Sequence, residues 1–297
     1  MSGTPKRRTP VTRIKASAQD GARALDFDTL LIENARKLVS FRRYLREMWE
    51  RRSLVRVLAA RELKGTYEMN IVGFAWWMLE PLSLAAVYFV LVKILQKGTP
   101  PSYVVFLLAS LIPFKWLNSS LIGSMGTVRQ NATLITDVYF PRALLPVTEN
   151  VIGLAHFGVG LLVVPLFMLI LGVGFSWSLL WLPVIAAVQL LFSLGISYPL
   201  SVWGLNYRNL PGLMGNVLRL WFYMTPALWR ISRVPTRLRF LIYLNPLTGI
   251  FRSYQGAIYD HHAPGFDLLW TAFIGVITLV FGSWYFTRRE AQFGKVL

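Results

Sequence analysis

The most informative part of this chain is the stretch Trp221–Leu247, WFYMTPALWRISRVPTRLRFLIYLNPL. It begins as an apolar, aromatic segment, breaks at Thr225-Pro226, passes through a basic turn and becomes apolar again before Asn245-Pro246. Proline cannot continue a helix without losing a backbone hydrogen bond, and unpaired backbone is costly in lipid. Such a broken segment must therefore be buried in protein or line a wet cavity. The pattern predicts a re-entrant element at the mouth of a pathway.

The rest of the chain has the composition of a membrane protein. Of 297 residues, 55% are hydrophobic, and the mean hydropathy is +0.48. Apolar stretches of about 20 residues recur, which is the length that a helix needs to cross a bilayer. The sequence contains no cysteine, which excludes disulfides, cysteine-based zinc sites and a thiol nucleophile.

The positive charge is distributed in the way that orients a membrane protein. The net charge is +17; residues 1–68 carry 16 Lys and Arg against 8 Asp and Glu, and residues 69–297 carry 15 against 6. In the second part most basic residues fall in loops and at the ends of apolar stretches, where they set orientation and meet anionic headgroups. This distribution argues against nucleic acid as a partner.

Two segments precede the first apolar stretch. Residues 1–52 are expected to form a cytoplasmic N-terminal extension, disordered over 1–28, with no signal peptide because no apolar core follows the first basic residues. Helical spacing of apolar residues over 29–52 predicts a soluble amphipathic helix, packed on its own domain or against a partner. Residues 53–68 have an apolar half and a basic half, which predicts a helix in the membrane interface.

The predicted fold is an all-α integral membrane protein. Residues 69–297 are expected to form a permease-like domain of six transmembrane helices. Two short re-entrant helices, at 233–244 and 246–259, are predicted between spans five and six. The spans are predicted at 71–95, 102–125, 145–172, 178–204, 212–229 and 267–287. An even number places both termini on one side. Basic residues indicate that this side is cytoplasmic: Arg129, Arg142, Arg208, Arg288, Arg289 and Lys295. The basic turn at 230–239 violates this rule and suggests a functional site there.

A search for catalytic motifs in the sequence finds none. It has no GxxxxGK[ST] phosphate loop, no HExxH and no GxSxG. His156 is expected to pack or hydrogen-bond within its span, and His261-His262 beside Asp260 fits an exposed loop better than a metal site. We therefore expect neither catalytic nor metal-binding residues, and any energy for uphill movement must come from another subunit.

Short motifs in a fixed order connect the chain to a known family. They are Arg61–Lys64, Gly73–Pro81, Val87-Tyr88, Leu111–Pro113, Val138–Arg142, Leu145-Pro146, Asn206–Leu210, Tyr223–Pro226, Val234-Pro235, Leu244–Leu247 and Phe293–Leu297. Through them the chain, from about Leu54 to its end, resembles the permease subunits of polysaccharide ABC exporters, the O-antigen, teichoic-acid and capsule permeases. It is most similar to the actinobacterial galactan exporter. It departs from the pattern at Lys115, at the motif 206–210 and in its first 50 residues.

The resemblance implies a homodimer that works with two copies of a cytoplasmic ATPase. ATP and magnesium would bind the ATPase, and this chain would hold no cofactor. The complex would move a lipid-linked glycan across the bacterial inner membrane from the cytoplasm. The alternative is an ABC exporter of a drug or small lipid. A secondary transporter is disfavoured because no internal repeat is visible, and a glycosyltransferase because no acidic metal motif is present.

Four groups of residues are candidates for sites under this resemblance. A substrate pathway would use Trp76, Trp77, Tyr88, Phe89, Lys115, Trp221, Phe222 and Tyr223, although such aromatics also serve as interface anchors. A lipid pyrophosphate would meet Arg56, Arg61 and Lys64, which could equally contact ordinary anionic lipid. The ATPase would couple through Asp137, Tyr139, Phe140, Pro141, Arg142 and Arg208, in what is otherwise a solvated loop. A periplasmic gate would involve Arg233, Pro235, Arg237, Asn245, Pro246 and Tyr254, and cysteines placed at positions 237 and 254 are expected to react with an impermeant thiol reagent from outside.

Charges inside the predicted spans give a further expectation. Glu80 and Lys115 lie roughly 14 to 15 Å from the cytoplasmic ends of consecutive spans, at 1.5 Å per residue. A lone charge at that depth is costly, so these two are predicted to pair. Glu149 and Arg219 are predicted to pair likewise. The competing hypotheses are that Lys115 faces a watery pore and meets substrate, or that one charge reaches an interface by snorkelling.

Overall fold

The computed structural model describes residues 41–68, 71–95 and 99–293, and over these ranges it contains helices, turns and loops but no strand. The chain divides into two units after Glu50. Within the first unit the structure describes one helix, α2 (Phe41–Glu50), which lies in the predicted amphipathic segment. The predictions for residues 1–40 lie outside the described residues.

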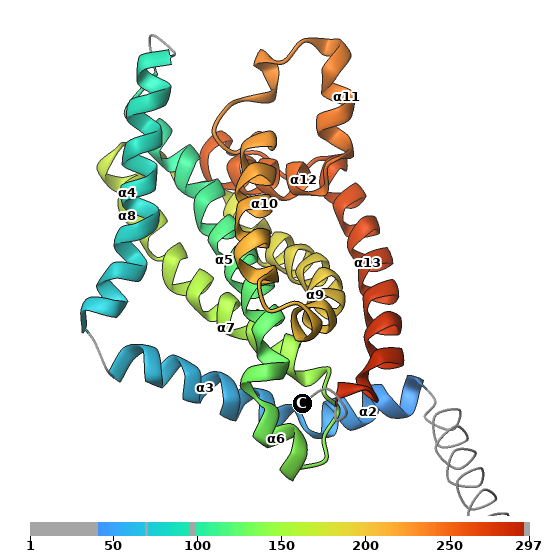
Figure 1. Ribbon diagram of the computed structural model, residues 1–297. Helices are drawn as coiled ribbons and strands as arrows, with labels where there is room; N and C mark the ends of the chain where they lie inside the picture. The colour runs from blue at the N-terminus through green and yellow to red at the C-terminus, as the bar shows by residue number, and fades with distance from the viewer. Residues whose placement is uncertain (1–40, 69–70, 96–98, 294–297) are drawn as a thin grey trace, which may run out of the picture. The chain divides into compact units, whose positions relative to one another are not determined.

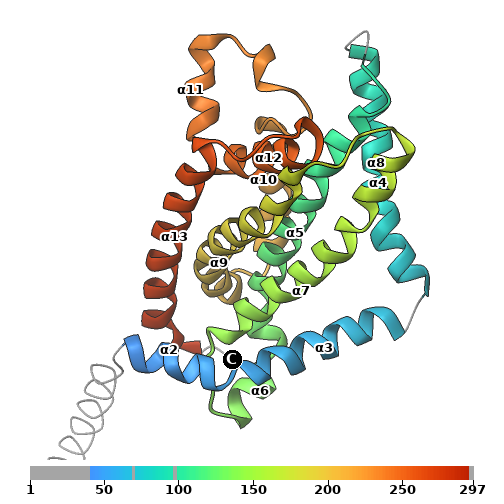
Figure 2. The same ribbon diagram turned by 180° about the vertical axis from the view of Figure 1, so that it is seen from behind.

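The second unit, from Arg51 onward, is a bundle of helices (Figures 1 and 2). Its elements in chain order are α3 (Arg52–Glu68), α4 (Ile71–Leu95), α5 (Tyr103–Gln130), α6 (Ala132–Asp137), α7 (Leu144–Leu161), α8 (Val163–Ile170), η1 (Trp177–Trp181), α9 (Leu182–Asn206), α10 (Leu210–Met224), η2 (Ile231–Arg233), α11 (Thr236–Leu244), α12 (Pro246–Gln255), η3 (Gly256–Asp260) and α13 (Phe266–Glu290). Helix α3 lies across one end of this bundle and α11 lies at the opposite end (Figure 1). We call these the α3 end and the α11 end.

Four helical stretches are long and apolar enough to cross a membrane. They are Tyr103–Gln130, Leu144–Ile170, Trp177–Asn206 and Phe266–Glu290, which match the predicted second, third, fourth and sixth spans. Helix α4 has the bounds of the first predicted span. Helix α10 has only 15 residues, or about 22 Å at 1.5 Å per residue, against a hydrocarbon core of about 30 Å. The count of six spans stays a prediction.

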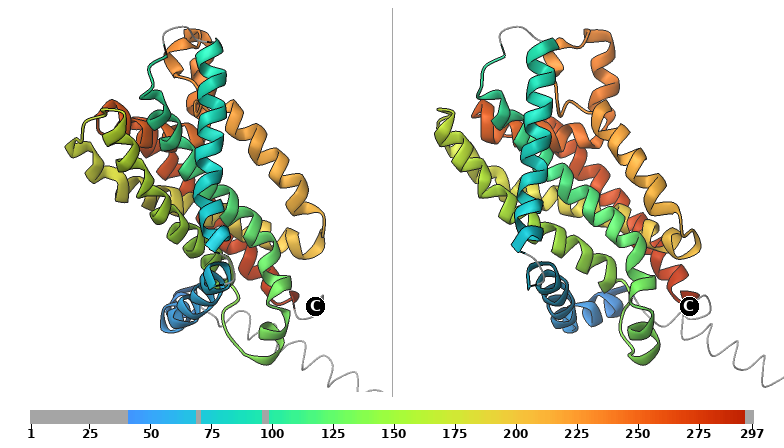
Figure 3. Two further views of the ribbon diagram at one scale, coloured as in Figure 1. Left: turned by 90° about the vertical axis from the view of Figure 1, so that its left-hand side faces the viewer. Right: turned by 60° about the vertical axis from the view of Figure 1, so that its left-hand side comes forward.

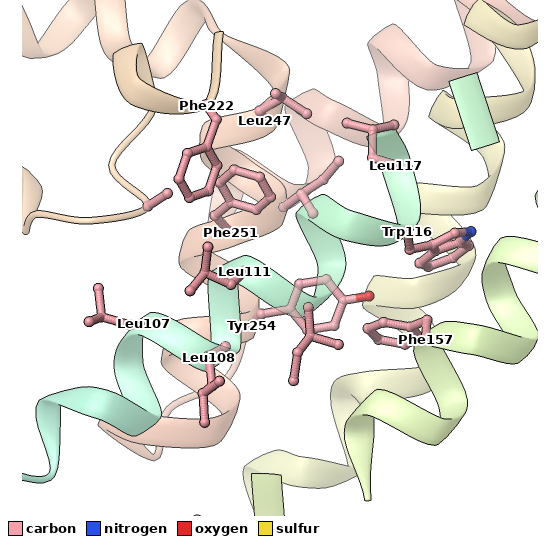
Figure 4. Close-up of a cluster of buried hydrophobic side chains, with 14 of the residues drawn as sticks. Leu107, Leu108, Leu111, Trp116, Leu117, Phe157, Phe222, Leu247, Phe251 and Tyr254 are labelled. Atoms are coloured by element: carbon pink, nitrogen blue, oxygen red, sulfur yellow. The ribbon is translucent and has the colours of Figure 1, made fainter. Parts of the chain in front are cut away.

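Helix α5 is the centre of the bundle. It packs against α4, α7, α9, α10 and α12, and Figure 3 shows α4 and α10 flanking it. The buried cluster in Figure 4 joins leucines of α5 to Phe157 of α7, Phe222 of α10 and Phe251 and Tyr254 of α12. Lipid tails are as apolar as these side chains, so close packing and hydrogen bonds, rather than exclusion of water, hold such a core together.

Helices α9 and α13 approach each other through glycines. A Cβ atom on Gly282 would overlap the Gly195 carbonyl oxygen, and one on Gly195 would lie 2.5 Å from the Leu279 amide nitrogen. Small residues at a crossing let two backbones touch, which is how membrane helices gain packing energy. This contact fixes α13 on α9 along the side of the bundle.

Helix α3 has the two faces that its sequence predicts. Val55 and Ala59 are buried, whereas Arg56, Arg61 and Lys64 are exposed. The apolar face packs against α7 at the α3 end. The helix and its faces are confirmed; its place in the membrane interface stays a prediction.

Candidate functional site

The stretch Trp221–Leu247 breaks where its prolines predict. Helix α10 ends at Met224 because Thr225 precedes Pro226 and takes an extended backbone, with ψ of 149°. The predicted span 212–229 is therefore too long at its C-terminal end. Pro235 and Asn245 cap α11 and α12, so two short helices are confirmed; α11 begins three residues later than predicted, and α12 ends at Gln255, where a π-helical turn continues to Asp260. Their re-entrant placement stays a prediction.

Gln255 satisfies the backbone that this break exposes. Its side-chain amide donates to the carbonyl oxygen of Pro226 at 2.9 Å and to Ser110 Oγ at 2.7 Å. Gln255 is 4% exposed, so both bonds form inside the protein. A buried carbonyl without a donor would cost about 1–3 kcal/mol. One side chain of α12 thus holds the broken segment against α5.

Asn245 joins the end of α10 to the turn between α11 and α12. Its Oδ1 accepts from Trp221 Nε1 at 2.9 Å and from the Leu247 amide at 3.1 Å, while its Nδ2 donates to Thr225 Oγ1 at 2.9 Å. The amide therefore uses both of its ends. Pro246 begins α12, where a missing N–H does no harm. Asn245 and Pro246 are positioned to fix the angle between the three short helices.

The arginines of the basic turn divide into two kinds. Arg230 lies over the rings of Phe106 and Tyr259, at 5.2 and 5.4 Å, and binds Asp260 at 2.8 Å. Arg239 donates to the carbonyl oxygens of Val234 and Ser232. Arg233 and Arg237 are exposed and have no hydrogen bond or ion pair within the part of the chain that the structure describes. Arg230 and Arg239 therefore stabilise the turn, whereas Arg233 and Arg237 are exposed on its surface.

Tyr254, predicted at the gate and expected to be accessible to a labelling reagent, is fully buried. Its ring packs on Phe157 in the core (Figure 4). That expectation of exposure is wrong, because α12 turns this face toward α5 and α7 rather than toward solvent. Arg233, Pro235 and Arg237 are the exposed members of the predicted gate.

The predicted pathway aromatics meet where α4 and α10 flank α5. The hydroxyls of Tyr88 and Tyr223 are 3.0 Å apart, and both rings contact Phe222. Phe222 itself is 2% exposed, so the prediction that it lines a surface is corrected: it supports the tyrosines from within the core. Phe89 lies beside Lys93, and Trp221 is tied to Asn245. The side chains of Trp76 and Trp77 lie outside the described residues.

The charges inside the predicted spans divide into one confirmed pair and one error. Lys115 Nζ lies 2.6 Å from Glu80 Oε2, so the pairing across α4 and α5 is confirmed. Glu149 is not paired with Arg219: no ion pair joins them in the described ranges, and the Glu149 side chain is hydrogen-bonded to Thr127 of α5 instead. Gly123 leaves the space on α5 that the Glu149 carboxylate occupies. The error arose because depth alone cannot say which helix a side chain faces.

A polar cavity of about 240 Å³ lies under α3, between α5 and α7. Arg61 borders it, together with Glu62 and Glu149. Burial against the cavity wall raises the pKa of the Glu62 carboxyl above its usual value. Arg56 and Lys64 do not line this cavity but lie exposed on α3. A pyrophosphate contact would therefore use the outer, basic face of α3 and not the cavity, where two carboxyl groups would repel it.

The loop between α6 and α7 is held from two other parts of the bundle. Arg51, just before α3, donates to the Tyr139 carbonyl oxygen at 2.6 Å, and its guanidinium lies 5.9 Å from the Tyr139 ring centroid. Glu290 at the end of α13 accepts from the Arg142 amide at 2.7 Å, and Arg142 Nη1 donates to the Glu290 carbonyl oxygen at 2.6 Å. We call Arg51, Arg142 and Glu290 the loop clamp.

The loop presents an apolar tip beyond this clamp. Tyr139 is 78% exposed and Val138 is 48% exposed, whereas Phe140 is buried and Pro141 follows it into the protein. Asp137 ends α6 and accepts from the Thr136 hydroxyl. Arg208 is exposed between α9 and α10. Of the predicted coupling residues, Tyr139 and Arg142 therefore lie in one loop that is hydrogen-bonded to Arg51 and Glu290, and no hydrogen bond or ion pair ties Arg208 to it within the described ranges.

Sequence reasoning missed several residues that build these regions. Gln255 was recognisable as a lone amide inside an apolar segment, where a buried polar group needs a partner. Arg51 and Glu290 gave no signal, because each lies in an ordinary charged stretch. The Asp260 carboxylate beside the two histidines binds Arg230. Over the ranges that the structure describes, no group of three metal-ligating side chains comes together.

These features define a multi-pass helical membrane protein with an anchored loop at one end and a broken, basic segment at the other. No family model matches the chain. The O-antigen export system permease protein RfbA of Myxococcus xanthus is 31% identical over 260 residues, which cover 85% of this chain and 98% of that protein. The protein of the same name from Klebsiella pneumoniae is 28% identical over 82% of this chain. The polysialic acid transport protein KpsM of Escherichia coli is 24% identical over 80%. The chain belongs to the family of polysaccharide export permeases.

Proposed function

We propose that this chain is the transmembrane subunit of an ATP-driven exporter that moves a lipid-linked polysaccharide across the bacterial inner membrane. The observation that carries the proposal is the similarity to O-antigen export permeases along nearly their whole length. In this proposal two copies of the chain work with two copies of a separate cytoplasmic ATPase, which binds ATP and magnesium, and the chain itself performs no catalysis.

The proposed topology has six spans, formed by α4, α5, α7 with α8, α9, α10 and α13. Both termini and the α3 end lie in the cytoplasm, and the α11 end faces outward. The distribution of basic residues supports this orientation. Exposed apolar side chains on α4 and α10, among them Val87, Ile94, Leu220 and Met224, supply a face for lipid and for the second copy.

The exposed tip Val138-Tyr139 is proposed to dock on the ATPase. An apolar, exposed side chain on a loop that is otherwise fixed offers buried area without a large loss of conformational freedom. Helix α6 and Asp137 lie beside the tip, and Arg208 is a second cytoplasmic contact. The outward cations Arg233 and Arg237 are proposed to meet the emerging glycan together with the aromatic rings of Tyr88 and Tyr223.

Deletion and complementation in the native host test the proposal. Loss of the gene should remove the polysaccharide from the cell surface and leave its lipid-linked form inside, and the intact gene should restore export. The purified chain is then reconstituted with its ATPase in vesicles that hold a lipid-linked glycan on the ATPase side. A glycosidase on the opposite side should reach the glycan only after ATP is added on the ATPase side. Export of a dye or small lipid with no effect on surface polysaccharide would favour the drug-exporter alternative.

A further inference from the structure

A pocket of about 590 Å³ opens at the α11 end, outside the groups discussed above. It lies between α11, α12 and the first turns of α13. Ligand sites in proteins occupy roughly 300–1,000 Å³ and combine apolar walls with a few polar groups. This pocket fits that description. Its lining side chains are Phe240, Tyr243, Phe266 and Trp270 on the walls and Arg252 and Asp267 at the ion pair.

The aromatic walls come from two separate helices. Phe240 and Tyr243 belong to α11, whereas Phe266 and Trp270 belong to α13. Helix α11 buries no side chain, and Phe240 and Phe266 are 68% and 80% exposed. Trp270 Nε1 donates weakly, at 3.4 Å, to the Leu244 carbonyl oxygen, which ties the two walls together. The rings therefore have open faces for a ligand.

An ion pair adds polar chemistry to the aromatic walls. Arg252 Nη1 lies 2.8 Å from Asp267 Oδ2, and the two side chains are 31% and 11% exposed. The Arg252 guanidinium also lies 5.2 Å from the centroid of the Tyr243 ring. The guanidinium has five N–H donors and the carboxylate has two acceptor oxygens, so the pair leaves hydrogen-bonding capacity unused. A ligand here can both donate and accept.

These groups select among ligand classes. An alkyl chain would cover the ion pair without replacing its hydrogen bonds to water, which is unfavourable. A phosphate would be attracted by Arg252 but repelled by Asp267. A sugar ring presents apolar C–H faces to aromatic rings and hydroxyls that donate and accept. We propose that this pocket binds a saccharide segment of the exported glycan, at a site separate from the pathway residues on α4 and α10.

This inference rests on the proposed function and is tested in the complete exporter in its native host. Phe240 and Phe266 are replaced singly by photoreactive benzoylphenylalanine; both are exposed, so folding should tolerate the change. Cells are irradiated while they export their own polysaccharide, and the cross-linked peptides are analysed by mass spectrometry. The control is the same substitution at Phe281, which is 60% exposed further along α13.

The expected result is a ladder of sugar masses on the peptides of positions 240 and 266, and lipid adducts alone at position 281. Combining Tyr243→Ala with Trp270→Ala should lower the sugar adduct at position 266 by roughly tenfold, as expected for lost aromatic contacts. Ile277→Ala, an exposed position on the same helix, should leave it unchanged.

Lipid adducts alone, or no adduct, at positions 240 and 266 in cells that export normally would overturn the saccharide site while leaving the proposed function intact. Surface polysaccharide that persists after deletion of the gene would instead overturn the proposed function, and the saccharide site with it. The two failures are therefore distinguishable.

Discussion

The loop between α6 and α7 and helix α11 are held in different ways. The loop is fastened by the clamp: the Arg51 guanidinium bonds the Tyr139 carbonyl oxygen, the Glu290 carboxylate accepts from the Arg142 amide, and the Arg142 guanidinium bonds the Glu290 carbonyl oxygen. The segment between α10 and α13 also contains charged pairs, Arg230 with Asp260 and Arg252 with Asp267, but its helix α11 has no buried side chain and is tied at its C-terminal end by the neutral amide of Asn245. Charge-assisted bonds are roughly twice as strong as neutral ones.

This difference fits the separate tasks of the two regions in the proposed exporter. A loop that receives force from an ATPase must move with the helices behind it, and the clamp attaches it to α3 and α13. An outer segment that opens for a glycan must separate locally, and elements with little buried surface open at a low free-energy cost. We therefore expect the loop at the α3 end to be stiff and helix α11, at the opposite end of the bundle, to open easily.

The largest expected effect comes from breaking the clamp. Arg142→Ala and Glu290→Ala each remove one charge-assisted bond, a loss of about 2 kcal/mol. Glu290→Gln should have a smaller effect, because its amide oxygen still accepts from the Arg142 backbone. We expect export to fall by at least about tenfold with ATP hydrolysis retained, measured in proteoliposomes that contain the ATPase.

The control for the clamp is Arg46→Ala, which breaks an exposed ion pair within α2. Such a pair contributes little, so export should not change. Equal losses of export and of ATP hydrolysis in the Arg142 and Glu290 variants would show that the clamp serves folding or assembly rather than transmission.

The next largest effect, on stability, is expected for Gln255 at the α11 end. Gln255→Leu leaves the Pro226 carbonyl and the Ser110 hydroxyl buried without their donor, and should destabilise the protein by about 1–3 kcal/mol. Thermal unfolding of the purified chain in detergent measures this loss. Gln292→Leu changes an exposed glutamine and is the matched control. An unchanged unfolding temperature for Gln255→Leu would mean that another group or a water satisfies the break.

A double-mutant cycle tests the charge pair between the two ends. Glu80→Gln or Lys115→Met alone removes one member of the pair and leaves the charge of the other, whereas the double variant removes both charges. The coupling free energy should be about 0.5–3 kcal/mol, with the double variant more stable than the sum of the singles predicts. Folded yield and unfolding temperature provide the measure, and strict additivity would show that the two charges do not interact.

The smallest effect on stability is expected for the outward arginines. Arg237→Cys removes no hydrogen bond or ion pair seen in the described ranges, and should change stability by less than about 0.5 kcal/mol. In this cysteine-free chain the new thiol should react with an impermeant reagent added from outside. Tyr254→Cys places its thiol in the core and should not react in the folded protein. Labelling of position 237 only from the cytoplasmic side would reverse the topology.

Much of the candidate site followed from local features of the sequence. Pro226, Pro235 and Pro246 placed the breaks because a proline acts on the backbone beside it. The pair Glu80–Lys115 was predictable because the two charges lie at one depth on consecutive helices. The same reasoning failed for Glu149 and Arg219, since helices that are not consecutive need not present facing sides.

The membrane class, the position of most helices and the breaks of the outer segment can be read from the sequence, because apolar length and proline act over a few residues. Which polar groups meet follows from the tertiary structure alone. Arg51 bonds a residue 88 positions away, Arg142 one 148 positions away, and Gln255 one 145 positions away. The four arginines of the basic turn show this. Arg230 contacts two rings and a carboxylate from other segments, and Arg239 bonds carbonyl oxygens of its own turn. Arg233 and Arg237 are exposed. Such partners depend on how the helices pack, and the spacing of residues along the chain does not predict that packing.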